Sequence, residues 1–140
     1  MGPFRDGWKI DDVETVLARG DPAEMLYAPI VVSLDPPDCD WAFSVCLCLV
    51  THTDLNVRSN ALLGFAHLSR TCGRSDESIV RPLVQAALLD PLMAGRASDV
   101  ADDLQMALGW HFERPLMSDE LAATYEFDYS QAKPNRFASQ

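Results

Sequence analysis

Residues 47–62 read Leu-Cys-Leu-Val-Thr-His-Thr-Asp-Leu-Asn-Val-Arg-Ser-Asn-Ala-Leu, and this stretch decides the fold. A continuous apolar segment ends here and a short polar turn follows. Apolar residues then return at steps of three and four, as on one face of a helix. Asp54 stands where its side chain can accept hydrogen bonds from the free amides that begin this second helix. The stretch therefore predicts a helix, a tight turn and another helix.

The same pattern returns 36 residues later in the chain. Leu47, Asp54, Ala61 and Leu68 recur as Leu83, Asp90, Ala97 and Leu104. In each copy the first leucine would pack the first helix, the aspartate would cap the second, and the alanine would let two helices approach closely. A weaker copy precedes these two, with Asp21, Ala28 and Val32 in the places of Asp54, Ala61 and Phe65. We therefore expect an all-α fold of three stacked helical hairpins, the minimum for a continuous repeat core.

Glycines and prolines divide the chain into helix-length pieces, and no convincing period-two strand is present. Helices are predicted over 11–19, 21–34, 39–51, 54–71, 75–89 and 94–108. The helix over 39–51 is apolar nearly all round, which is typical of a central buried helix. Pro82 is expected to bend the fifth helix or to delay its regular part. Residues 1–110 would form the repeat domain and 111–140 an irregular extension that docks on this domain or on a partner, with Trp110 and Phe112 covering its end.

The composition fits one domain and points to a basic partner. The chain has 140 residues, of which 48% are hydrophobic, enough for one proper core. Twenty-one acidic residues oppose eleven basic ones, so the formal net charge is -10. This charge opposes a phosphate backbone and argues against direct nucleic-acid binding. The same field would speed the approach of a basic protein.

The beginning of the chain resembles neither a secretion signal nor an amphipathic presequence. The longest apolar run, residues 45–50, is far shorter than the roughly 20 residues needed to span a bilayer. A cytoplasmic protein without membrane contact is therefore expected. Cys39, Cys46, Cys48 and Cys72 are expected to be reduced and mostly buried thiols. Cys46 and Cys48 lie two residues apart, and so on nearly opposite sides of a helix.

The residue patterns that commonly carry chemistry are missing from the sequence. The three histidines lie far apart, and none has a ligand-type residue at a spacing that would complete a metal site. The seven glycines are scattered, without a phosphate-binding loop or a nucleophile elbow. We therefore expect no enzyme, no catalytic residue, no bound metal and no cofactor.

The segment 54–62, with the preceding residues 47–50, resembles HEAT repeats. In that family an apolar helix leads to an Asp turn, and a Val-Arg pair followed by Ala opens the second helix. The next unit matches at Asp90 and Ala97, but Met93 and Ala94 occupy the Val-Arg positions, and Arg96 is displaced by two. The resemblance covers about residues 38–110. It implies a right-handed stack of hairpins with a concave face for partners.

Small acidic HEAT-like chains of this size are similar to the immunity proteins that bacteria make against their own secreted toxins. The segment 127–138 is similar to short C-terminal tails of some bacterial antitoxins. These resemblances imply an immunity protein that neutralises a basic toxin domain by occlusion. A HEAT-like scaffold or regulatory subunit is the alternative. A lyase-like role in attaching a chromophore is a third reading, which would need a catalytic Cys or acid in a cleft.

Asp99, Asp102 and Asp103 form the first candidate binding patch, because residues three and four apart share a helical face. They form either an ordinary solvated face paired with Arg96 or a surface for the basic side chains of a toxin. The 36-residue spacing places Leu63, Ala66 and His67 at the matching positions of the fourth helix, with Asn60 on the same exposed face. The second candidate is the aromatic tail, which would dock on the helices or on a partner. Its predicted contact residues are Tyr125, Phe127, Tyr129 and Arg136, with Phe137 as a further aromatic.

Overall fold

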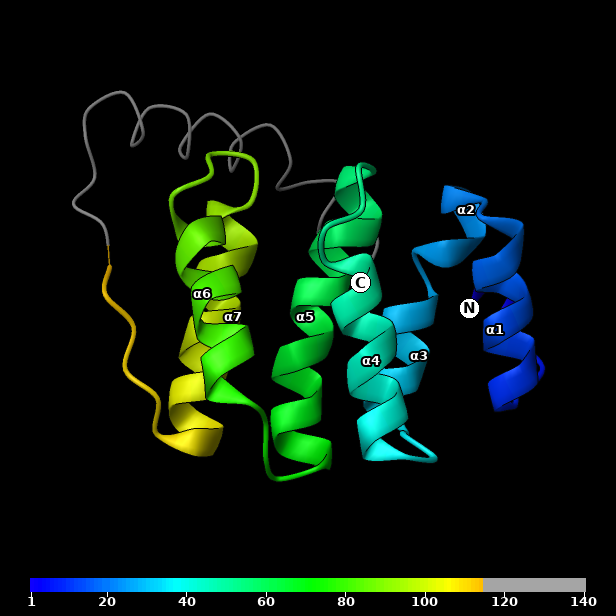
Figure 1. Ribbon diagram of the computed structural model, residues 1–140, viewed down its shortest axis with the longest axis horizontal. Helices are drawn as coiled ribbons and strands as arrows, with labels where there is room; N and C mark the ends of the chain where they lie inside the picture. Colours follow the sequence, from blue (N-terminus) through cyan, green and yellow to red (C-terminus); the bar gives the residue numbers. More distant parts are fainter. Residues whose placement is uncertain (115–140) are drawn as a thin grey trace.

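The computed structural model describes residues 1–114 of the chain, and all regular structure in this part is helical. The elements are η1 (Gly2–Phe4), α1 (Ile10–Arg19), α2 (Pro22–Met25), α3 (Ala28–Leu34), α4 (Cys39–Leu49), α5 (Leu55–Thr71), α6 (Glu77–Leu88) and α7 (Ala94–Leu108) (Figure 1). The predicted all-α class is confirmed. Most predicted helices agree with the observed ones to within two residues at either end.

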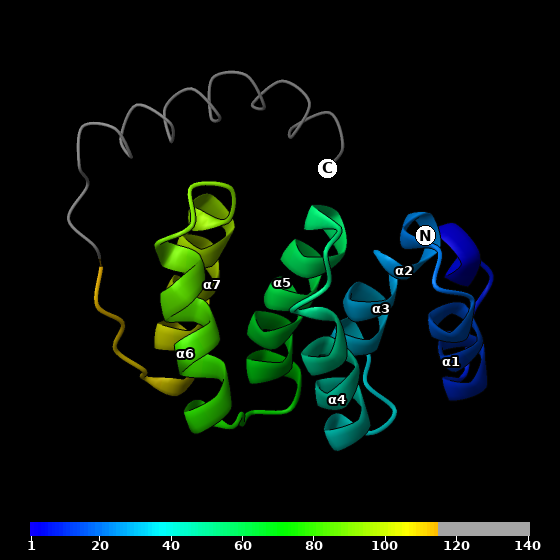
Figure 2. The ribbon, with the colours of Figure 1, turned by 45° about the horizontal axis from the view of Figure 1, so that its top comes forward.

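The long helices form two layers. Helices α3, α5 and α7 pack side by side, with α5 in the middle. Helix α4 packs on α3 and α5, and α6 packs on α7. Figures 1 and 2 show α4 and α6 on the same side of the α3–α5–α7 layer, with α1 at the far end from α7. Short connections join α4 to α5 and α6 to α7, so each pair is antiparallel.

Helix α5 lies at the centre of the hydrophobic core. Its Val57, Ala61 and Phe65 are fully buried. Gly64 allows α4 to approach closely, because a Cβ atom at this position would lie 2.5 Å from Cys46 Sγ. The core is completed beyond α7 by Trp110 and Phe112, which are 9% and 7% exposed. Their predicted role of covering the end of the core is confirmed.

The turn before α5 has the predicted capping geometry. The carboxylate of Asp54 accepts hydrogen bonds from the amides of Asn56 at 2.9 Å and Val57 at 3.1 Å. The guanidinium of Arg58 donates back to the carbonyl of His52 at 3.0 Å. Both side chains therefore satisfy backbone groups that a helix start and a tight turn would otherwise leave unpaired.

Three details differ from the expected helices. The single helix predicted over 21–34 is broken into α2 and α3, because Pro29 has no amide to donate and its ring crowds the preceding turn. Helix α6 runs through Pro82, and its regular part begins at Glu77, two residues later than predicted. Asp90 does not cap α7, which begins at Ala94 without a side-chain cap. The carboxylate of Asp90 instead accepts a hydrogen bond from the amide of Leu92 within the turn.

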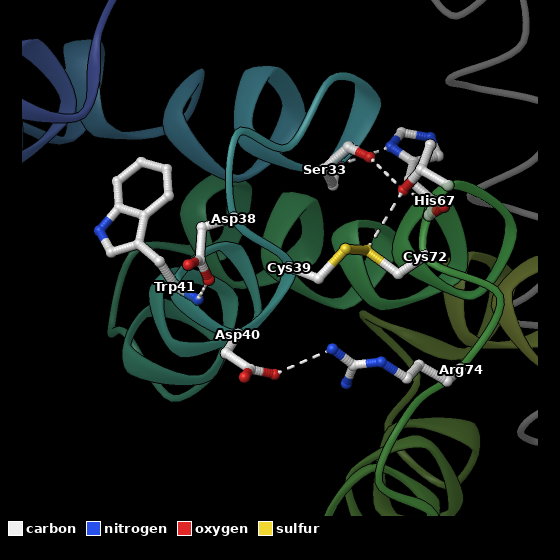
Figure 3. The surroundings of a disulfide bond; sticks show 9 residues. Ser33, Asp38, Cys39, Asp40, Trp41, His67, Cys72 and Arg74 are labelled. Carbon is white, nitrogen blue, oxygen red and sulfur yellow. Dashed lines mark hydrogen bonds and ion pairs between the residues drawn. A yellow bond between two sulfur atoms is a disulfide. The ribbon is translucent and has the colours of Figure 1, made fainter.

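The prediction of four reduced thiols is wrong for one pair. Cys39 and Cys72 form a disulfide, with their Cα atoms 6.1 Å apart (Figure 3). The antiparallel packing of α4 and α5 brings the first residue of α4 beside the residue that follows α5, a proximity that spacing along the chain does not reveal. Cys46 is buried and Cys48 is exposed, so the predicted separation of these two side chains is confirmed. Disulfides are more typical of oxidising compartments, and the cytoplasmic location stays a prediction.

Candidate functional site

The structure brings together most of the residues that the 36-residue spacing had placed on one surface. We call this surface the α5–α7 face and define it by Leu63, His67, Arg70, Arg96, Asp99 and Asp103. Arg70 of α5 and Asp103 of α7 form an ion pair of 3.1 Å. Arg70, Asp103 and Arg96 all act electrostatically on His67. Leu63 and Asp99 lie one helical turn from His67 and Asp103 and share their stripes.

None of the four α5 residues expected on the exposed surface is exposed: Asn60, Leu63 and His67 are half-buried, and Ala66 is fully buried. The side-chain amide of Asn60 donates to the carbonyl of Leu26 at 2.8 Å, where the chain passes from α2 to α3. His67 Nδ1 shares a hydrogen bond of 2.9 Å with Ser33 Oγ of α3. The expectation that Asn60 and His67 are fully exposed is therefore wrong, because both side chains join α5 to the preceding helices.

His67 is held toward its neutral form. Burial lowers the pKa of the His67 imidazole, and the nearby positive charges of Arg70 and Arg96 lower it further. The carboxylate of Asp103 acts in the opposite direction on the same pKa. A neutral imidazole suits the hydrogen bond to Ser33, because one ring nitrogen can then accept while the other donates.

The Ser33–His67 pair raises the question of a nucleophile with its base. Ser33 is fully buried, and its hydroxyl also lies 3.1 Å from the carbonyl of Ile30. Thr71, in the same seam between α3 and α5, donates to the carbonyl of Ser33 at 3.0 Å. Figure 3 shows Ser33 and His67 beside the disulfide. An activated serine must be reachable by its substrate, so we assign this pair to packing between helices.

The three acidic residues of α7 differ in their surroundings. Asp103 pairs with Arg70 as described, and Asp102 pairs with Arg114 at 2.6 Å. Asp99 is exposed, and its carboxylate forms no ion pair or hydrogen bond with another residue of 1–114. Two of the three charges are therefore partly compensated by the protein itself. Asp99 is the one most available to a partner.

Sequence reasoning missed Arg70. In the 36-residue register its counterpart is Met106, an exposed apolar residue, so the register suggested no partner for it. The helical spacing from His67 to Arg70 was the available signal, because residues three apart share a face. Arg70 adds a second basic side chain, besides Arg96, to the candidate patch. The predicted tail contacts, Tyr125, Phe127, Tyr129 and Arg136, lie outside the described residues.

Within residues 1–114, no cluster of three or more His, Cys, Asp or Glu side chains is arranged to hold a metal ion. No helix in this part of the chain is both long and apolar enough to cross a membrane. Comparisons with models of protein families, with curated proteins and with solved structures find no match to this chain. The candidate site therefore has to be judged from its own residues.

Proposed function

We propose that this chain is a protein-binding module, and specifically an immunity protein that occludes a basic toxin domain through its α5–α7 face. The observation that carries the proposal is the exposed carboxylate of Asp99, which has no ion-pair partner among residues 1–114, on a layer whose other side is covered by α4 and α6 (Figure 1). The net charge of -10 supplies the long-range attraction for a basic partner. Asp99 would supply a short-range contact to a lysine or arginine.

The side chains around Asp99 suit a protein interface. Met106, two helical turns from Asp99 on α7, is 87% exposed, and Leu34, the last residue of α3, is 51% exposed. Leu63 lies half-buried between these helices. Interfaces commonly combine apolar contacts with a polar and charged rim. This combination supports a binding surface better than a purely solvated one.

A scaffold or regulatory subunit remains the alternative, and one observation favours it. Arg70, which pairs with Asp103, and Arg96 give the face positive as well as negative groups. A mixed surface can bind a partner of balanced charge, whereas the attraction of a strongly basic toxin comes from the excess of negative groups. The two functions are separated by the charge of the partner and by the salt dependence of binding.

Co-expression with the polypeptide encoded immediately upstream tests the proposal. We expect the upstream polypeptide alone to arrest growth, and co-expression to restore growth and yield a complex that survives affinity purification. A complex without toxicity would favour the scaffold. If no complex forms and the upstream polypeptide is not toxic, the immunity function is contradicted.

The contribution of the face is tested by the variant Asp99→Asn, with Glu14→Gln as its matched control. Glu14 is an exposed acid of α1, at the other end of the layers. Both variants lose one negative charge. We expect Asp99→Asn to slow association more than the control, and mainly at low salt. Equal rates for the two variants would exclude Asp99 from the interface.

A further inference from the structure

A second feature lies at the other end of the molecule, away from the α5–α7 face. A cavity of about 620 Å³ opens between the start of α1 and the turn that joins α3 to α4. Trp8, Lys9 and Asp11 line it from the α1 side, and Asp35 and Pro37 from the turn. The volume is within the range of roughly 300–1,000 Å³ that is typical of ligand pockets.

The aromatic wall of this cavity is held in place. Trp8 stacks on Trp41 of α4, with ring centroids 6.3 Å apart and an angle of 28° between the planes. Trp8 is half-buried, so part of its indole remains available to the cavity. An indole that is supported from behind offers a flat, electron-rich surface at little cost in side-chain entropy.

The two carboxylates of the cavity are not used within the described structure. Asp11 and Asp35 are exposed, and neither side chain forms a hydrogen bond or ion pair with another residue of 1–114. Asp12 shows the contrast, because its carboxylate accepts from the amide of Lys9 at 2.7 Å and so caps α1. Two free negative charges beside an indole are complementary to a planar cation.

We propose that this cavity receives an arginine side chain of the partner protein, with the guanidinium on Trp8 and its N–H groups directed at Asp11 and Asp35. The inference rests on the proposed function, which supplies a basic partner, and adds a second contact at the α1 end of the molecule, away from α7 (Figure 1). Arginine is favoured over lysine because its guanidinium both stacks on an aromatic ring and donates along several directions. Lys9 is the one basic residue in the cavity lining and opposes a cationic ligand.

The test uses a blocked tripeptide, N-acetyl-Gly-Arg-Gly-amide, titrated into the full chain, with the citrulline peptide as its uncharged counterpart. NMR signals of the indole Nε1–H groups report binding, since the chain has three tryptophans and they can be assigned by substitution. We expect the Trp8 signal to shift with the arginine peptide, more than that of Trp110 and more than with citrulline.

Variants give the expected order of affinities. Asp35→Asn and Trp8→Leu should each weaken peptide binding by about twofold to fivefold, as for an exposed ion pair or cation–π contact. Lys9→Gln should strengthen it. Glu14→Gln is the control, because Glu14 lies one turn from Asp11 but does not line the cavity. Thermal unfolding checks that Trp8→Leu still folds, and Asp35→Asn tests the site if it does not.

Equal binding of the arginine and citrulline peptides would overturn the inference, as would equal effects of Asp35→Asn and Glu14→Gln. The peptide assay needs no toxin, so it is independent of the growth assay. If the peptide does not bind but a stable toxin complex forms, the cavity is not an arginine site and the proposed function stands. If the peptide binds but no toxin complex forms, the cavity is an arginine site and the immunity function is contradicted.

Discussion

The α4–α5 and α6–α7 pairs share one 36-residue register and yet are built differently at their turns. Ala61 of α5 and Ala97 of α7 occupy matching positions of this register, and both are fully buried. Asp54 caps α5 through two amides, whereas Asp90 accepts one hydrogen bond within the turn and leaves α7 uncapped. The two pairs therefore agree at these core positions and differ in their polar turns.

The two pairs are also fastened by different means. The disulfide Cys39–Cys72 joins the start of α4 to the end of α5. The α6–α7 pair is joined by the segment after α7, where the Gln85 side chain accepts from the amide of Glu113 and donates to its carbonyl, both at 3.0 Å. The guanidinium of Arg81 lies 4.9 Å from the ring centre of Phe112. Two helices of an antiparallel pair can therefore be held together either by a disulfide or by a segment that packs on one of them.

The largest expected effect tests whether the core register is shared. Leu68→Ala and Leu104→Ala remove side chains that are 2% and 0% exposed, at equivalent positions of α5 and α7. Each should lower the free energy of unfolding by about 2–5 kcal/mol, since both leave a cavity in a packed core. Denaturant unfolding measures this loss. Leu89→Ala, at a site 64% exposed, should change it by less than about 0.5 kcal/mol; a large loss at only one of the two core sites would show that the pairs are not equivalent.

The next effect concerns the disulfide. Cys39 and Cys72 are 33 residues apart, and a cross-link over such a loop typically contributes about 2–4 kcal/mol by restricting the unfolded chain. Reduction should lower the free energy of unfolding by this amount, and the double variant Cys39→Ser with Cys72→Ser should be insensitive to reductant. An equal stability of the oxidised and reduced wild-type chain would mean that packing alone fastens α4 to α5.

Thiol labelling controls the disulfide experiment. Burial raises the pKa of the Cys46 thiol to about 12, so it stays protonated and unreactive in the folded chain. Cys48 is exposed. We expect the folded, oxidised protein to label at Cys48 alone, and the reduced protein to label additionally at Cys39 and Cys72. Labelling of Cys46 before unfolding would contradict its placement in the core.

A smaller effect is expected at the two turns. Asp54→Ala should lower the free energy of unfolding by about 0.5–2 kcal/mol, the usual loss for a helix cap. Asp90→Ala should cost less, because Asp90 does not cap α7. Asp54→Asn keeps an acceptor and is the control. Equal losses of unfolding free energy in the two alanine variants would show that the two aspartates stabilise their turns to the same extent.

The smallest effect is a dependence on pH at His67, which occupies the position of Asp103 in the register. The pKa of His67 is lowered in the folded state, so the unfolded chain binds the proton more readily. Its contribution to stability is present above the unfolded value of about 6.5 and is lost as the pH falls through that value toward the folded pKa. Wild type should therefore lose more stability than His67→Gln between pH 7.5 and about 5.5. Parallel curves would contradict the lowered pKa.

Much of the fold follows from local sequence signals. Asp54 and Asp38 mark helix starts, and Gly20 and Gly109 mark helix ends with positive φ. These signals act within a few residues, which is why they can be seen in one sequence. The break between α2 and α3 was also present in the sequence as Pro29, and was missed.

The rest depends on contacts between distant parts of the chain. The Cys39–Cys72 bond and the Arg70–Asp103 pair are set by how α4, α5 and α7 lie against one another. The helical pattern places Asn60 on an exposed face because it gives no sign that the carbonyl of Leu26 lies within hydrogen-bond reach. The register brings His67 and Asp103 to adjacent positions of α5 and α7, but it gives no signal for Arg70 or for the charges that ion pairs already compensate.

Hydrogen exchange of the full chain, free and in complex with the upstream polypeptide, tests the central claim most directly. We expect added protection along α5 and α7, around His67 and Asp99, with α4 and α6 unchanged. Protection confined to α4 and α6, or none in a stable complex, would contradict the assignment of the α5–α7 face as the binding surface.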